Sequence, residues 1–264
     1  MASCARIAAV LLVVSLVGCA GAAADGAGSS CVSEPIVGGA PSPELVRLAE
    51  AELGAIVAVL ARPAGSSAEP DLCSGVAVEP GVVLTARHCV TSDDDPSGHG
   101  LEVSVVAGSP FEPSVRGGAA DRIRLHPRLD IALLDVSWLA ASNGPFVPLE
   151  RGELVDAWVG TPVELAGFGE SGSELGTLAF AVEPVARLET DHIVVDGAGA
   201  SGACLGDSGG PLFGATPAGV RVLGILDYGA ASCVGEDFYT RVDRLWDWEP
   251  LLDPGDSGSP ACSR

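Results

Sequence analysis

The amino-acid sequence predicts an all-β protein of two packed antiparallel six-stranded barrels, followed by a short C-terminal helix. The first observation is a series of short, valine-rich runs separated by clusters of Pro, Gly and Ser. The second is that these runs form two sets of about six, on either side of residues 141–145. The third is composition: 35 glycines, 19 prolines and only 19% charged residues are typical of a globular β protein.

The first set of runs is expected to form a barrel over about residues 36–140, with strands at residues 55–61, 75–78, 82–86, 101–108 and 130–136. The second set predicts a barrel over about residues 146–240, with strands at residues 162–169, 179–188, 192–197, 211–214 and 220–229. Residues 241–252 have apolar side chains at helical spacing, with Val242, Leu245, Trp246 and Trp248 on one side. The C-terminal helix is therefore placed there.

The N-terminus has the features of a targeting segment. Residues 1–18 read as a signal peptide, because one positive charge precedes an apolar run that is too short to span a bilayer. The tetrapeptide LVGC that ends at Cys19 resembles a bacterial lipobox, and residues 19–35 would then be a Gly- and Ala-rich tether. The alternative is an ordinary signal peptide cut near Ala24, which would remove Cys19. We expect a secreted or cell-envelope protein, lipid-anchored as a bacterial lipoprotein in the first case.

The charge balance bears on partners. With 14 basic and 35 acidic residues, the formal net charge is −21. Such a surface repels nucleic acid and anionic membranes, so no nucleic-acid partner is expected, and membrane contact is expected only through a lipid anchor.

Cysteine usage agrees with export. Apart from Cys4 and Cys19, six cysteines remain, and a secreted context favours disulfides. Their number allows fifteen pairings, which spacing alone does not resolve. No CxxC pair occurs and the spacings are wide, so no zinc site is expected. We expect neither a metal nor an organic cofactor. The six are Cys31, Cys73, Cys89, Cys204, Cys233 and Cys262.

The string GDSG occurs twice, around Ser208 and around Ser257. The first copy fits G-x-S-x-G, the nucleophile elbow of α/β-hydrolases, in which the histidine follows the serine. All four histidines precede Ser208, which excludes that fold: His88, His99, His126 and His192. The order histidine, aspartate, serine remains, with an imidazole to take the hydroxyl proton and a carboxylate to orient it. His88 in LTARHCV and Asp130 in HPRLDIALLDV are the candidates.

These strings resemble the TAAHC, DIAL and GDSGGP blocks of the chymotrypsin/trypsin-like serine peptidase family. IVGG at residues 36–39, GFG at 167–169 and FYTRV at 238–242 resemble further family blocks in the same order. The resemblance implies a trypsin-like fold over residues 36–252, with residues 253–264 as a tail. It assigns His88 as general base, Asp130 as its orienting acid and Ser208 as nucleophile. The backbone N–H groups of Gly206 and Ser208 would form the oxyanion hole.

The same resemblance implies roles for other residues. Ser257 lies too near the C-terminus to build a pocket behind it and is read as a tail residue. His99, His126 and His192 are read as surface or core residues. The resemblance implies the disulfides Cys73–Cys89 and Cys204–Cys233. Cys31 and Cys262 would then pair with each other, or else stay free or bond to another molecule.

Activation departs from the family pattern. In the family, a trimmed N-terminal isoleucine pairs with the aspartate before the nucleophile, which implies the pair Ile36 and Asp207. The bond to be cut follows Pro35, where the family usually has Arg or Lys. Either a proline-tolerant protease activates the chain, or it works uncut, or it remains a zymogen.

The specificity pocket departs as well. The resemblance implies that Gly202 is the floor residue, which argues against simple trypsin specificity. It places Asp237 on the inner wall, where the side chain would meet a basic substrate side chain, plug the pocket or lie in solvent, and it implies that Gly229 leaves the rim open. Asp227 replaces a serine that supports the catalytic aspartate, and two nearby carboxylates cannot both ionise cheaply. Tyr228 in place of tryptophan is a milder change.

Three consecutive aspartates, Asp93 to Asp95, read either as a solvated acidic loop or as oxygen ligands for Ca²⁺. The sequence as a whole predicts a secreted, monomeric serine endopeptidase that forms an acyl-enzyme. Its partners would be protein or peptide substrates, a protein inhibitor and an activating protease. The alternative is a catalytically weak or inactive homologue that binds peptides or proteins.

Overall fold

The computed structural model describes residues 36–111, 115–140, 145–170 and 175–248. Every described residue belongs to one compact unit. The predicted signal peptide, the tether with Cys19, the pair Cys31 and Cys262, and the tail with Ser257 lie outside the described residues.

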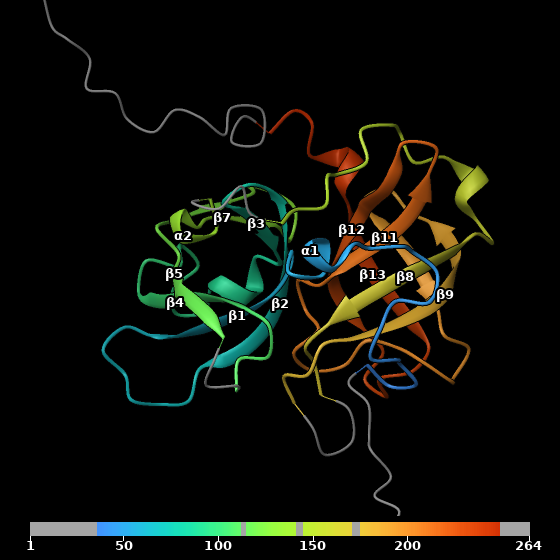
Figure 1. The fold of residues 1–264 in the computed structure, drawn as a ribbon. Coiled ribbons are helices and arrows are strands. Elements are labelled where there is room, and N and C mark those ends of the chain that lie inside the picture. Colours follow the sequence, from blue (N-terminus) through green and yellow to red (C-terminus); the bar gives the residue numbers. More distant parts are fainter. Residues whose placement is uncertain (1–35, 112–114, 141–144, 171–174, 249–264) are drawn as a thin grey trace, which may run out of the picture. The chain divides into compact units, whose positions relative to one another are not determined.

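The N-terminal half folds into a seven-stranded antiparallel sheet with the strand order β5-β4-β1-β2-β3-β7-β6 (Figure 1). Its small β-branched and aliphatic side chains fill one core, in which Val57, Val76, Val83 and Leu134 are fully buried. Packing of this kind suits a sheet whose strands read as nearly continuous apolar runs. The strands are β1 (Ile56–Pro63), β2 (Asp71–Glu79), β3 (Val82–Thr85), β4 (Leu101–Ala107), β5 (Arg116–Ala119), β6 (Arg122–Leu125) and β7 (Ala132–Asp135).

The C-terminal half forms a closed barrel with the strand order β10-β13-β12-β11-β8-β9 (Figure 1). Closure leaves no unpaired edge among the described strands of this half. The predicted all-β, trypsin-like fold class is confirmed, and this half is a six-stranded barrel as expected, whereas the N-terminal half is a seven-stranded sheet and not a second six-stranded barrel. The strands are β8 (Pro162–Gly167), β9 (Ala179–Leu188), β10 (His192–Asp196), β11 (Pro211–Thr216), β12 (Gly219–Gly229) and β13 (Glu236–Arg241).

Helical structure in the described residues is limited to short turns: α1 (Glu50–Leu53), η1 (His88–Val90), α2 (Ser137–Ala140), η2 (Asp156–Trp158) and η3 (Val242–Arg244). The sequence predicts a helix over residues 241–252. The structure differs at the first of these residues, because Arg241 is the last residue of β13 and pairs with Gly224 of β12. Its buried guanidinium donates to Asp243 and to the Leu154 carbonyl, which keeps this segment in the barrel wall. A 3-10 turn follows, and residues 249–252 lie outside the described part. No helix among the described residues is long and apolar enough to cross a membrane.

Ser74 of β2 connects the first sheet to the segment that carries Ser208. Its backbone N–H donates to the Ser208 carbonyl at 2.8 Å. Its hydroxyl donates to the Gly206 carbonyl at 2.9 Å and accepts from the Phe168 N–H at 2.9 Å. One buried serine therefore sets the position of the GDSG turn against both halves of the fold.

Candidate active site

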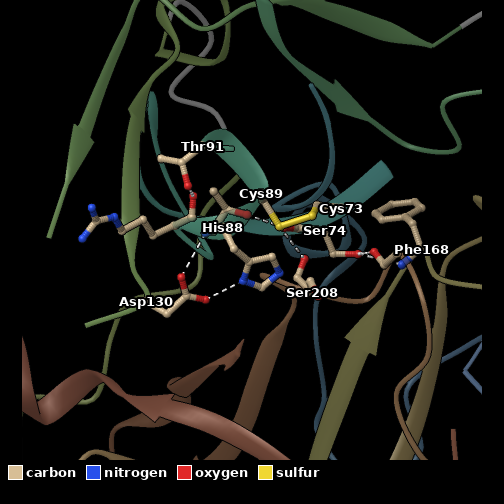
Figure 2. Close-up of a disulfide and its surroundings, with 11 residues drawn as sticks. Cys73, Ser74, His88, Cys89, Thr91, Asp130, Phe168 and Ser208 are labelled. Carbon is tan, nitrogen blue, oxygen red and sulfur yellow. Dashed lines mark hydrogen bonds and ion pairs between the residues drawn. A yellow bond between two sulfur atoms is a disulfide. The ribbon is translucent and has the colours of Figure 1, made fainter. Parts of the chain in front are cut away.

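His88 and Asp130 are brought together by the pairing of two strands. His88 opens the turn η1 shortly after β3, and Asp130 lies just before β7, which pairs with β3 from Val82 to Thr85. Nδ1 of His88 lies 2.6 Å from Oδ2 of Asp130, and the His88 backbone N–H donates to Oδ1 at 2.9 Å (Figure 2). Two contacts to one carboxylate fix both the backbone and the ring of His88.

The electrostatics favour an ionised Asp130. Burial raises the pKa of Asp130, but its hydrogen bonds to His88 and the imidazole charge bring the pKa below the ordinary 3.8. Burial lowers the pKa of His88, yet the hydrogen bond and charge of Asp130, with the charge of Asp227, raise that pKa above 6.5. A carboxylate at Nδ1 holds the neutral ring with its proton there, which leaves Nε2 free to accept one.

Ser208 lies on the other side of the imidazole. Figure 2 shows the His88 ring between the carboxylate of Asp130 and Ser208. The Ser208 carbonyl accepts from Ser74 at 2.8 Å and lies 3.6 Å from Sγ of Cys89, which forms a disulfide with Cys73. The three residues selected by the resemblance thus meet from three separate parts of the chain.

The turn before Ser208 presents backbone N–H groups to the same place. Gly206 has φ +96°, a conformation that L side chains rarely adopt. Within the described residues, no backbone hydrogen bond engages the N–H of Gly206 or of Ser208. Both residues line the cleft beside His88. Two free donors near a hydroxyl are what a developing oxyanion requires.

The cleft has a volume of about 590 Å³. The disulfide Cys204–Cys233 and the end of β12 form its wall, and Asp227, Tyr228 and Gly229 line it as the sequence predicts. Gly202 and Asp237, predicted as part of the specificity pocket, do not line it: Gly202 lies against the backbone of Cys233, and Asp237 lies against Ala203 and Gly229.

Residues 50–248 match the Trypsin family. The chain belongs to the trypsin family. A CLIP domain-containing serine protease of Bombyx mori, HP8, is 29% identical over 222 residues, which cover 67% of this chain and 60% of that protein. Serine protease 56 of Mus musculus is 29% identical over 226 residues, which cover 72% of this chain and 36% of that protein. The chain therefore spans less than two thirds of the length of either relative.

Asp237 of this trypsin-family chain is completely buried. Its Oδ2 accepts from the Ala203 N–H at 2.7 Å, and its Oδ1 lies against Gly229, where an added Cβ would be 2.2 Å away. Burial raises the pKa of Asp237 to about 6. Of the three sequence alternatives, a solvated side chain is wrong, because the carboxylate is buried against Ala203 and Gly229. The other two, a basic-substrate contact and a plug, both remain compatible with this position.

Asp207 and Ile36 are both buried in the barrel half of this trypsin-family protein. The Asp207 carboxylate accepts from the N–H groups of Gly169 and Cys204, each at 2.8 Å. Burial raises the pKa of Asp207 to about 7 against the effect of these bonds. The Ile36 side chain packs in the core of the closed barrel, and Val37 forms a bridge with Gly202.

His192 is the site residue that sequence reasoning missed. Its Nε2 lies 2.9 Å from Oδ2 of Asp227, and Asp227 offers a carboxylate oxygen within 4.8 Å of ligand atoms of His88 and Asp130. The available signal was Asp227 itself, because a second acid beside Asp130 calls for a proton or a donor. Which histidine supplies that donor depends on tertiary contacts and has no local signature.

Two groups of described residues bring three possible metal-ligand atoms within 4.8 Å of one another. Cys73 and Cys89 of the first are joined in a disulfide and offer no thiolate. In the second, His88, Asp130 and Asp227, the imidazole Nδ1 is already hydrogen-bonded to Asp130. In the acidic loop, Asp95 accepts from the N–H of Gly100 and the hydroxyl of Ser97, so the loop's own donors occupy both of its oxygens.

Proposed function

We propose that this trypsin-family protein is a serine endopeptidase with Ser208 as nucleophile. The observation that carries the proposal is the 2.6 Å contact from His88 Nδ1 to Asp130, with Ser208 on the opposite side of the ring. Membership of the family and the two serine-protease relatives support the same reaction class.

The reaction follows from the roles of these atoms. Nε2 of His88 takes the Ser208 hydroxyl proton as Oγ attacks the substrate carbonyl, and the N–H groups of Gly206 and Ser208 stabilise the oxyanion. The imidazolium then gives its proton to the leaving amine, and the C–N bond breaks to leave an acyl-enzyme. Water attacks the ester with His88 again as base, which releases the acid and restores Ser208.

Activation would follow cleavage of the Pro35–Ile36 bond. A new ammonium at Ile36 would find in Asp207 a buried carboxylate whose two described donors are neutral backbone N–H groups. Pairing with a cation would favour the charged form of Asp207. A proline-tolerant protease would be the activating enzyme, and the uncut chain would be a zymogen.

The substrate preference has two candidates, both protein or peptide. A basic side chain before the scissile bond would be favoured by the buried Asp237 carboxylate behind Gly229. A small or apolar side chain would be favoured if Asp237 only closes the pocket. An arginine and an alanine reporter peptide, compared at equal concentration, separate the two.

For location, we propose export through residues 1–18 as a signal peptide, with residues 19–35 as a tether and Cys19 as the lipidation site. The two disulfides in the described residues support an oxidising compartment. Mass analysis of the mature N-terminus tests both steps, because diacylation of Cys19 and cleavage near Ala24 give different masses.

The experiment that tests the activity is fluorophosphonate labelling of the full chain and of a form that begins at Ile36, with Ser208→Ala as control. Labelling of the trimmed form alone supports a peptidase that is held as a zymogen. Labelling of both forms supports a peptidase for which Pro35 is no barrier. Folded protein that is unlabelled in both forms contradicts the proposal and favours the binding-module alternative.

A further inference from the structure

Asp227 lies in a β-bulge of β12. Leu226 pairs with Tyr239 and Tyr228 with Phe238 on β13, so Asp227 has no partner across the pair. A bulge of this kind turns one side chain away from the regular alternation and is common beside active sites. Here the turned side chain is a half-buried carboxylate that lies within 4.8 Å of ligand atoms of both His88 and Asp130.

Two adjacent carboxyl groups can hydrogen-bond only if one of them holds a proton, because an ionised carboxylate has no donor. Burial raises the pKa of Asp227 and the Asp130 charge adds to this, although its bond to His192 acts in the opposite sense. The pKa of Asp130 is below its ordinary value. The opposite directions of the two pKa shifts make Asp227 the partner that would hold a shared proton, with its carboxyl O–H as donor to the Asp130 carboxylate.

His192 reaches Asp227 across an intervening strand. His192 begins β10 and Asp227 lies on β12, with β13 between them in the barrel. Nε2 lies 2.9 Å from Oδ2 of Asp227. The ring stands edge-on to Tyr228 and Phe238, with ring centroids 5.8 and 6.1 Å away, and these two rings stack on each other. The aromatic pair holds the imidazole in one orientation.

We propose that Asp227 and His192 extend the His88–Asp130 pair into a four-residue hydrogen-bonded chain, in which His192 is a positioning residue. The Nε2–H of His192 donates to Asp227, the Asp227 carboxyl donates to Asp130, and Asp130 accepts from His88. The protonated carboxyl of Asp227 thus serves as the donor to Asp130 in place of a hydroxyl, and the hydrogen bond from His192 keeps that carboxyl oriented toward Asp130. The expected effect on the reactivity of Ser208 rests on the proposed function. The hydrogen-bonded chain of the four residues does not.

The titratable groups that face Asp227 come from four parts of the fold. They are His192 of β10, His88 of η1, Asp130 before β7 and Tyr228 of β12 itself. Beyond Tyr228 stand Arg187 and Glu189, which are paired with each other. Because Arg187 is held by Glu189 and Glu236, His192 is the basic side chain that bonds Asp227 directly.

The test is a double-mutant cycle on the trimmed protein, with the second-order rate of fluorophosphonate labelling as readout. His192→Phe should slow labelling about tenfold, because Asp130 loses an aimed donor. His192→Gln, which keeps an N–H near the position of Nε2, should recover part of that loss. In an Asp227→Ser background, which supplies a hydroxyl directly, adding His192→Phe should change the rate by less than about twofold. His99→Phe, in an exposed loop, is the matched control and should leave the rate unchanged.

A second readout is the ¹⁵N titration of the His88 imidazole by NMR, which needs no activity. His192→Phe should raise the His88 midpoint, since an unsupported Asp227 donates less well and leaves more charge on Asp130. In the Asp227→Ser background the same change should leave the midpoint in place. Equal losses of rate in both backgrounds, or an unmoved midpoint, overturn the inference. If wild type is folded and unlabelled while the midpoint moves as expected, the proposed function fails and the hydrogen-bonded chain stands.

Discussion

The carboxylate of Asp207 lies so close to the backbone of Gly169 that a Cβ there would be 2.4 Å from its Oδ2 and Cγ. The Gly169 N–H donates to Oδ1 of the same group at 2.8 Å. Asp207, the residue before the candidate nucleophile, therefore packs directly against Gly169 of the GFG string. The absence of a side chain at residue 169 is a structural requirement.

Gly169→Ala should consequently displace Asp207 and the turn that carries Ser208. We expect a loss of about 2–3 kcal/mol in the free energy of unfolding, together with loss of fluorophosphonate labelling. Gly199→Ala is the control: an added Cβ there meets nothing within 4 Å, and only its φ of +79° is unfavourable. That control should cost about 1 kcal/mol and retain labelling. If the two variants lost the same stability and labelled alike, that would contradict the close contact between Gly169 and Asp207.

Ser74→Ala tests the connection between the first sheet and the GDSG turn. The change leaves the buried Phe168 N–H without its acceptor and frees the Gly206 carbonyl. We expect a loss of about 1–3 kcal/mol in denaturant unfolding and slower labelling of Ser208, because the N–H groups of the turn lose their fixed position. Ser104→Ala on β4 is the control and should change neither quantity. Full labelling by a destabilised Ser74→Ala would limit the role of Ser74 to stability.

Three buried acids make stability depend on pH. Burial raises the pKa of Glu183 to about 7, of Asp207 to about 7 and of Asp237 to about 6. In the unfolded chain these groups ionise near pH 4, so from there to about pH 7 the folded state binds more protons. Stability contributed by the protonated acids is then lost as pH rises through this window.

Glu183→Gln isolates one of these groups, since the amide can still accept from the Ser201 hydroxyl, which lies 2.9 Å from Oε1. Near pH 4 the variant and wild type should unfold at similar temperatures. Above pH 7 the variant should be the more stable by a few kcal/mol, because wild type then holds an ionised carboxylate in the core. Thermal unfolding at a series of pH values measures the difference. A constant difference across that range would contradict the raised pKa.

The sequence was sufficient for the features that depend on local pattern. The valine-rich runs predict most strands, and the HCV, DIAL and GDSGG strings select residues that lie together in the structure. It was insufficient where a contact crosses strands. His192 and Asp227 meet over β13, and Arg241 extends β13 because its guanidinium is buried beside Asp243, although its neighbours follow a helical pattern.

Asp207→Asn should have opposite effects on the two forms of the protein. In the full chain it removes a buried carboxylate whose described donors are backbone N–H groups, so the unfolding temperature at pH 8 should rise. In the form that begins at Ile36 it removes the partner of the new ammonium, so labelling of Ser208 should fall about tenfold or more. Comparing both forms at pH 5 and pH 8 provides the control, since the stabilisation of the full chain should vanish at pH 5, where wild-type Asp207 is already protonated. Undiminished labelling of the trimmed variant would mean that Ile36 and Asp207 do not act as an activation pair.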